Sequence, residues 1–151
     1  MTVSPEKLDD RVVSASDVLA YAASAILVAW GVGHLAPTRA VAASFGRISL
    51  DNRRILVMEW MAEGFMHISI GLLVILATAI HGAADSTTEL LYVVCAGIQL
   101  VMAALTAVTG ARTPVIWFRI CPFVLSSAAA LLVLASVTSW RASLPRTTQA
   151  R

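Results

Sequence analysis

The sequence predicts an all-α integral membrane protein that folds as a four-helix, up-down bundle. Of its 151 residues, 58% are apolar and only 13% are charged, whereas soluble domains average about 45–50% and about 25%. The mean hydropathy is +0.80. Four apolar stretches are each about as long as the roughly 20 residues that cross a hydrocarbon core of about 30 Å. Short polar segments separate them, so we expect one domain over residues 1–151.

The four expected helices follow one another with short connections. Both termini and the 81–88 loop then fall at one end of the bundle (side A), and loops 37–54 and 110–113 fall at the other (side B). Five basic residues at each side leave the orientation in the membrane undecided. Counted in chain order, the helices are expected at about 16–36, 55–80, 89–110 and 114–140.

Each helix begins beside a residue that can cap it. Glu89 stands three residues after Ser86, which is the spacing of a capping box. Pro114 directly follows Thr113 and suits a first helical position. The N-cap candidates, in chain order, are Ser14 or Ser16, Asp51 or Asn52, Ser86, and Thr113.

The loop between the first two helices carries a helical pattern of its own. Val41, Phe45 and Ile48 recur at helical spacing opposite arginines. This pattern predicts a short helix that lies on the membrane surface.

Charge and composition exclude several classes of protein. Half the usual share of charged residues cannot solvate the surface of a soluble domain of this length, and a net charge of +2 is too small to indicate a polyanionic partner. We therefore expect a multi-pass protein of the inner (plasma) membrane that contacts the lipid bilayer and binds no nucleic acid.

The second helix carries a stripe of ionisable residues. Glu59, Glu63 and His67 are four residues apart, so they share one face of a helix. A charged group at the bilayer centre costs about 2.5–3.5 kcal/mol on insertion scales. Gly64 and Gly71 flank the stripe and allow another helix or a ligand to come close. The stripe is therefore the first candidate for a functional site.

The other helices contribute polar and aromatic residues that we expect to line a pocket in the side B half. A lipophilic molecule that enters from the bilayer would bind there. The expected substrate-binding residues are His34, Gln99, Arg112, Arg119, Trp60 and Trp117.

A buried carboxyl group beside a histidine suits general acid–base chemistry. We expect Glu63 to act as the acid and His67 as its proton partner, with Glu59 as a third catalytic candidate and Arg119 as the counter-charge. The ligand would be an isoprenoid, a quinone or a sterol-like molecule. The reaction would be an isomerisation, an epoxide opening or a cyclisation.

Structural interpretations of the same residues stay open. Glu63 and Arg119 could form an ion pair that fixes helix register, and Glu59 could lie among the headgroups beside arginines. No metal or cofactor is expected, because di-iron bundles need a Glu-x-x-His pair on each of two helices. His34 and His67, counted from their helix ends, also fall at different depths in the membrane.

Two segments of the chain resemble the small four-helix bacterial membrane proteins of the DoxX-like group. They are Gly31-Val32-Gly33-His34-Leu35-Ala36-Pro37 and the stretch from Glu63 to Leu73, with its glycine-leucine-leucine run. The resemblance implies that His34 and Glu63 are paired polar positions. It also implies the alternative function, a non-catalytic accessory subunit of a quinone-linked oxidoreductase or another membrane complex. A second copy of the chain is an open alternative as partner.

Overall fold

The computed structural model describes residues 13–143, which form helices and turns and contain no strand. Four of the helices are long and apolar enough to cross a membrane, so the prediction of an all-helical chain with four candidate membrane spans is confirmed. A short helix, α2, lies between the first two long helices, as expected, but it contains only Val41 of the predicted pattern, because Phe45 and Ile48 lie beyond its end. The helices are α1 (Ala15–Leu35), α2 (Thr38–Ser44), α3 (Leu50–His81), α4 (Ser86–Val108) and α5 (Ile116–Ser143), with a 3₁₀ turn, η2, at Gly110–Arg112.

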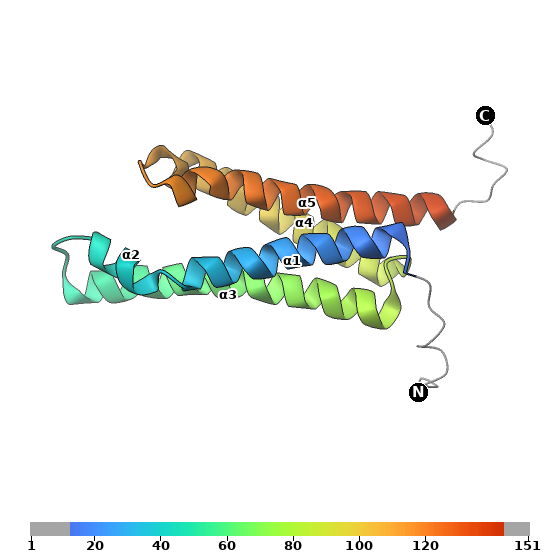
Figure 1. Cartoon of the computed structure of the whole chain (residues 1–151), viewed down its shortest axis with the longest axis horizontal. Helices are drawn as coiled ribbons and strands as arrows, with labels where there is room; N and C mark the ends of the chain where they lie inside the picture. The colour runs from blue at the N-terminus through green and yellow to red at the C-terminus, as the bar shows by residue number, and fades with distance from the viewer. Residues whose placement is uncertain (1–12, 144–151) are drawn as a thin grey trace.

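The long helices lie alongside one another (Figure 1). Helix α2 and the α4–α5 connection are at side B. The α3–α4 connection, the beginning of α1 and the end of α5 are at side A. Helix α1 packs against α3 and α5, and α4 packs against α5, whereas α3 and α4 make few contacts with each other. The chain therefore forms two successive helical pairs, α1 with α3 and α4 with α5, which meet through α1 and α5.

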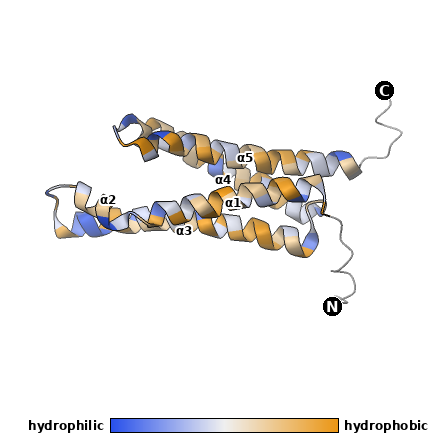
Figure 2. Cartoon of the chain, in the orientation of Figure 1, coloured by the Kyte–Doolittle hydropathy of each residue, from blue (hydrophilic) through white to orange (hydrophobic). Residues whose placement is uncertain are grey.

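Hydropathy follows the length of the helices (Figure 2). Hydrophilic residues gather at the beginning of α3 and at the α4–α5 connection, and again near side A, while the middle of each helix is mostly apolar. This is the pattern expected of spans whose ends lie at membrane–water interfaces.

The N-terminal caps of the first two long helices lie close to the expected positions. Ser14 caps α1 in a capping box with Asp17, which confirms one of the two expected residues. Ser49 caps α3 instead of Asp51 or Asn52, so α3 begins five residues before the expected Ile55. The charged residues at its start are compatible with a helix because they lie beyond the apolar segment, where water solvates them.

The expected caps of the last two helices are wrong. Asp85 caps α4 by accepting hydrogen bonds from the backbone N–H groups of Thr87 and Thr88, so Ser86 is inside the helix. Helix α5 begins at Ile116, because the backbone first makes the 3₁₀ turn that ends at Arg112. The sequence predicted where these helices begin to within a few residues. It did not predict which of several neighbouring polar residues caps each helix.

Small residues bring α1 and α3 together. A Cβ atom built on Gly31 would lie 2.6 Å from the backbone oxygen of Gly64, and one built on Gly71 would lie 2.7 Å from a methyl group of Val28. The backbones are therefore in direct contact, as expected for glycines in membrane helices.

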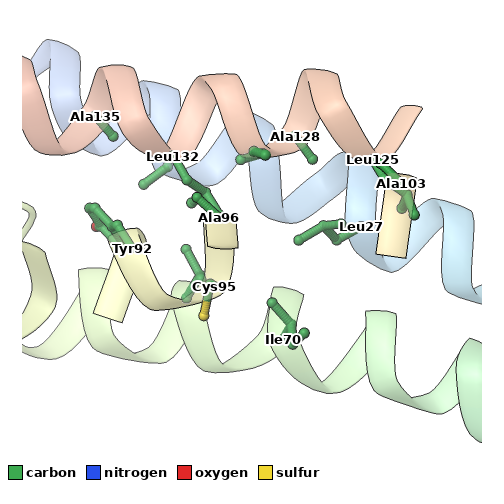
Figure 3. Packing of buried hydrophobic residues seen from close by; sticks show 14 of the residues in the cluster. Leu27, Ile70, Tyr92, Cys95, Ala96, Ala103, Leu125, Ala128, Leu132 and Ala135 are labelled. Carbon is green, nitrogen blue, oxygen red and sulfur yellow. The ribbon is translucent and has the colours of Figure 1, made fainter. Parts of the chain in front are cut away.

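The core is also built from small side chains. Figure 3 shows buried alanines of α5 and α4 around Leu27, Leu125 and Leu132. Seven core positions within the helices are alanines that are at most 5% exposed, which lets the helices approach closely; they are Ala20, Ala23, Ala96, Ala103, Ala128, Ala129 and Ala135.

A set of polar contacts ties the α3–α4 connection to the other helices at side A. Asp17 of α1 accepts a hydrogen bond of 2.9 Å from the backbone N–H of Ala83. Ser139 of α5 donates to the Ala83 carbonyl oxygen at 2.9 Å and also contacts the carboxylate of Glu89. We call these residues the side A clasp. They join α1, α4 and α5 around one loop residue.

Candidate functional site

Glu63 lies between two histidines in the interior of the first helical pair. Its carboxylate is 3.6 Å from Nε2 of His34 on α1 and 3.8 Å from Nε2 of His67 on α3. His67 is fully buried and His34 is 9% exposed, whereas the side chain of Glu63 is 26% exposed. These separations allow ion pairing and are slightly longer than a direct hydrogen bond. We call the three residues the His34–Glu63–His67 cluster.

Helix spacing and helix register assemble the cluster. Glu63 and His67 are neighbours because residues four apart share a helix face. His34 joins them because Gly31, one turn earlier, packs on Gly64. The expectation that the two histidines fall at different depths in the membrane is wrong, because both lie beside the Glu63 carboxylate. Helix α3 begins well beyond the end of α1, with α2 folded back on it, so positions counted from the helix ends do not align.

Trp60 holds His34 in place. The indole stacks on the imidazole with ring centroids 3.7 Å apart and an interplanar angle of 19°. Trp60 Nε1 also donates a hydrogen bond of 2.9 Å to the backbone carbonyl of His34. On its other side Trp60 meets the ring of Phe118 edge-on at 5.6 Å. The aromatic contacts fix the ring of His34 and connect the cluster to α5.

Six buried polar side-chain atoms in the described part of the chain have no hydrogen-bond partner. Buried groups of this kind are rare, and each costs about 1–3 kcal/mol when it is left unsatisfied. Counted from the α3–α4 connection at 1.5 Å per residue, His67 and Gln99 both lie about 20 Å along their helices, so they share a depth. The six buried polar atoms without a hydrogen bond are Trp30 Nε1, His34 Nε2, His67 Nδ1 and Nε2, and Gln99 Oε1 and Nε2.

Sequence reasoning missed two residues of this region. Trp30 and Cys121 are buried or partly buried here but are not among the residues expected to form the site. Cys121 is a buried free thiol that lies near enough to Glu63 for the charge of the carboxylate to act on it. The signal for Cys121 is its place on the buried stripe of α5, four residues before Leu125.

Four predicted site residues lie on exposed surface, outside the cluster. Glu59, Arg112 and Arg119 are exposed, and Trp117 is 64% exposed. The expected pairing of Glu63 with Arg119 is not found within residues 13–143. Arg119 is two residues before Cys121, whose side chain faces the core, so a rotation of about 200° turns the guanidinium outward. His34 takes the place expected for Arg119.

Within the described residues, no group of three or more His, Cys, Asp or Glu side chains is arranged to hold a metal ion. A shallow, open groove lies along the outer face of α3 near side B, apart from the cluster. The chemistry of the cluster therefore comes from one carboxyl group and two imidazoles in a buried setting.

Comparison of the chain with family models, with curated proteins and with solved structures gives no match. The resemblance to the DoxX-like group thus stays a prediction, and the function is argued from the residues alone.

Proposed function

We propose that this chain is an inner-membrane protein whose four long helices form an up-down bundle, and that the His34–Glu63–His67 cluster binds the polar group of a lipophilic ligand. An isoprenoid, a quinone or a sterol-like molecule has the required chemistry, with a mostly apolar body and one or two oxygen atoms. A ligand of this kind dissolves in the bilayer and needs no aqueous entrance.

The observation that carries the proposal is a set of buried polar atoms that make no hydrogen bond, including His34 Nε2 and His67 Nε2, which lie 3.6 and 3.8 Å from the Glu63 carboxylate. Imidazole and indole N–H groups donate, and the glutamine amide can do both. A hydroxyl or carbonyl oxygen placed among them would satisfy atoms that are otherwise costly to bury. A purely structural cluster would be expected to satisfy its own polar atoms.

The same arrangement supports acid–base catalysis. Glu63 would give a proton to the ligand or take one from it, and His67 would exchange protons with Glu63 from the adjacent turn. His34, held by Trp60, would supply the opposite charge when it is protonated. Double-bond migration, epoxide opening and cyclisation each require a proton to be added at one atom and removed at another.

The direct test is to purify the full chain with native lipid and to identify co-purifying small molecules by mass spectrometry. Glu63→Gln and His67→Ala should lose the bound molecule, whereas Glu59→Gln should retain it. Glu59→Gln is a matched control, because it makes the same change on the same helix at an exposed position. Circular dichroism must show that each variant keeps its helices.

Catalysis can be tested separately from ligand binding. In D₂O an acid–base enzyme exchanges deuterium into its ligand, and this incorporation should disappear in Glu63→Gln. If the folded Glu63→Gln variant binds and labels the ligand as the wild type does, the proposed site is wrong. If no small molecule is found and the chain co-purifies with a membrane oxidoreductase unaffected by Glu63→Gln, the accessory-subunit alternative replaces the proposal.

A further inference from the structure

The groove on the outer face of α3 has a polar end and an apolar length. It is shallow and open, and all the residues that line it belong to α3. Arg53 and Arg54 line the end near side B, and Val57, Met58, Met61 and Phe65 continue toward the middle of the helix. Met58 and Phe65 are 59% and 53% exposed. Glu63 and His67 point from other sides of α3, so this groove is separate from the cluster.

Charge is distributed unevenly between the two ends of the described chain. Side B has six arginines against two acidic residues, Asp51 and Glu59. Side A has three acidic residues against one arginine, Arg141. The groove therefore begins in the most positive part of the described structure. The arginines at side B are Arg39, Arg47, Arg53, Arg54, Arg112 and Arg119.

The two arginines at the groove are placed to receive an anion. An Nη atom of Arg53 donates a hydrogen bond of 3.0 Å to the carbonyl oxygen of Gly46, which holds the guanidinium beside the loop. Arg54 is 3.5 Å from the carboxylate of Asp51, and both side chains are mostly exposed. A guanidinium has five N–H donors, so each of these contacts leaves donors for a phosphate.

We propose that this groove binds one anionic phospholipid, with its phosphate at Arg53 and Arg54 and an acyl chain along the apolar length. Arg54 and Phe65 are separated by about 16 Å at 1.5 Å per residue. This distance matches one leaflet of a hydrocarbon core of about 30 Å. When the arginines are at headgroup level, Phe65 is therefore near the bilayer midplane. The surplus of arginine favours an anionic headgroup over a zwitterionic one.

The test is native mass spectrometry of the full chain in detergent, titrated with dioleoylphosphatidylglycerol or with dioleoylphosphatidylcholine. The wild type should bind the first lipid more tightly. Arg53→Gln with Arg54→Gln should weaken phosphatidylglycerol binding roughly 30-fold, since each arginine near an anionic surface contributes about a fivefold factor. Arg39→Gln with Arg47→Gln removes the same charge from the same end and should change the binding by about twofold or less.

Asp51→Asn is the variant that separates lipid binding from helix stability. It removes the carboxylate that competes for Arg54 and should strengthen phosphatidylglycerol binding about two- to fivefold. An unchanged or weaker affinity in Asp51→Asn overturns the proposal. Equal binding of the two lipids, or an equal loss in both double variants, also overturns it, because either result indicates a diffuse basic surface. A stable dimer that carries no phosphatidylglycerol would assign the groove to a second copy of the chain instead.

Discussion

Replacing Gly31 with alanine should force α1 and α3 apart at their closest approach. The new Cβ atom would lie 2.6 Å from the backbone oxygen of Gly64 and 2.7 Å from Cγ1 of Ile68. Ordinary contacts begin at 3.4 Å, so the oxygen must move by about 0.8 Å. A side chain could rotate away, but a backbone oxygen moves only with its helix. The strain therefore acts on the whole α1–α3 interface.

The size of the effect follows from two opposing contributions. Overpacking of this kind typically costs about 1–3 kcal/mol. Alanine is preferred over glycine inside a helix by about 0.5–1 kcal/mol, which offsets part of that cost. Gly33 supplies the matched control, because no heavy atom lies within 4 Å of a Cβ built there. The difference in free energy of unfolding between Gly31→Ala and Gly33→Ala should thus be about 1–3 kcal/mol, with the helix preference cancelled.

The measurement is unfolding by sodium dodecyl sulfate in mixed micelles, followed by far-ultraviolet circular dichroism and tryptophan fluorescence. Gly33→Ala should be slightly more stable than the wild type, and Gly31→Ala should be clearly less stable than Gly33→Ala. If the two variants unfold at the same detergent fraction, α1 and α3 do not meet at Gly31 and Gly64. The register that brings His34 to Glu63 would then be wrong as well.

Three further predictions concern individual polar contacts. Asp17→Ala removes the acceptor for a buried N–H of the α3–α4 connection and should lower the free energy of unfolding by about 1–3 kcal/mol; a loss below a few tenths would contradict the side A clasp. Trp60→Phe keeps an aromatic ring but loses the indole hydrogen bond and should cost about 0.5–1.5 kcal/mol in the same assay, whereas the exposed Trp117→Phe should have little effect. The backbone N–H of Thr88 holds the pKa of Asp85 below its usual value. Because the folded-state pKa is the lower one, the contribution of this cap is complete above pH 3.8 and is lost as the pH falls through the folded-state value. Asp85→Asn, which caps without titrating, should remove this part of the acid sensitivity in unfolding measured from neutral pH downward.

The positions of the four long helices were predictable because a membrane span must satisfy its backbone hydrogen bonds internally and must be apolar over a fixed length. The helix ends were less predictable. Ser49 begins α3 and Asp85 begins α4, although Asp51 and Ser86 are also good caps. Beyond the bilayer core, hydropathy no longer constrains the chain, and several neighbouring residues compete for the same role.

Helical spacing alone predicted the candidate site only within one helix, whereas the resemblance to the DoxX-like group paired His34 with Glu63, whose side chains lie 3.6 Å apart. The four-residue spacing placed Glu63 beside His67, and the structure brings them together. The position of His34 depends on how far α3 extends past α1, which no pattern within a single helix encodes. The prediction that Arg119 points into the bundle was wrong because the inward face of α5 was misidentified. Arg119 shares a helical spacing with moderately polar residues of α5, but the alanine-rich stripe through Ala128 is the face that packs inward.

The order of helices along the chain has a consequence for how the protein is made. His34, Glu63 and His67 all belong to the first helical pair, which the ribosome completes before it begins α4. The carboxylate therefore enters the bilayer in the same hairpin as both imidazoles, and its burial does not have to wait for the rest of the chain. The second pair arrives at a site whose ionisable groups are already together, and it contributes Phe118, which contacts Trp60.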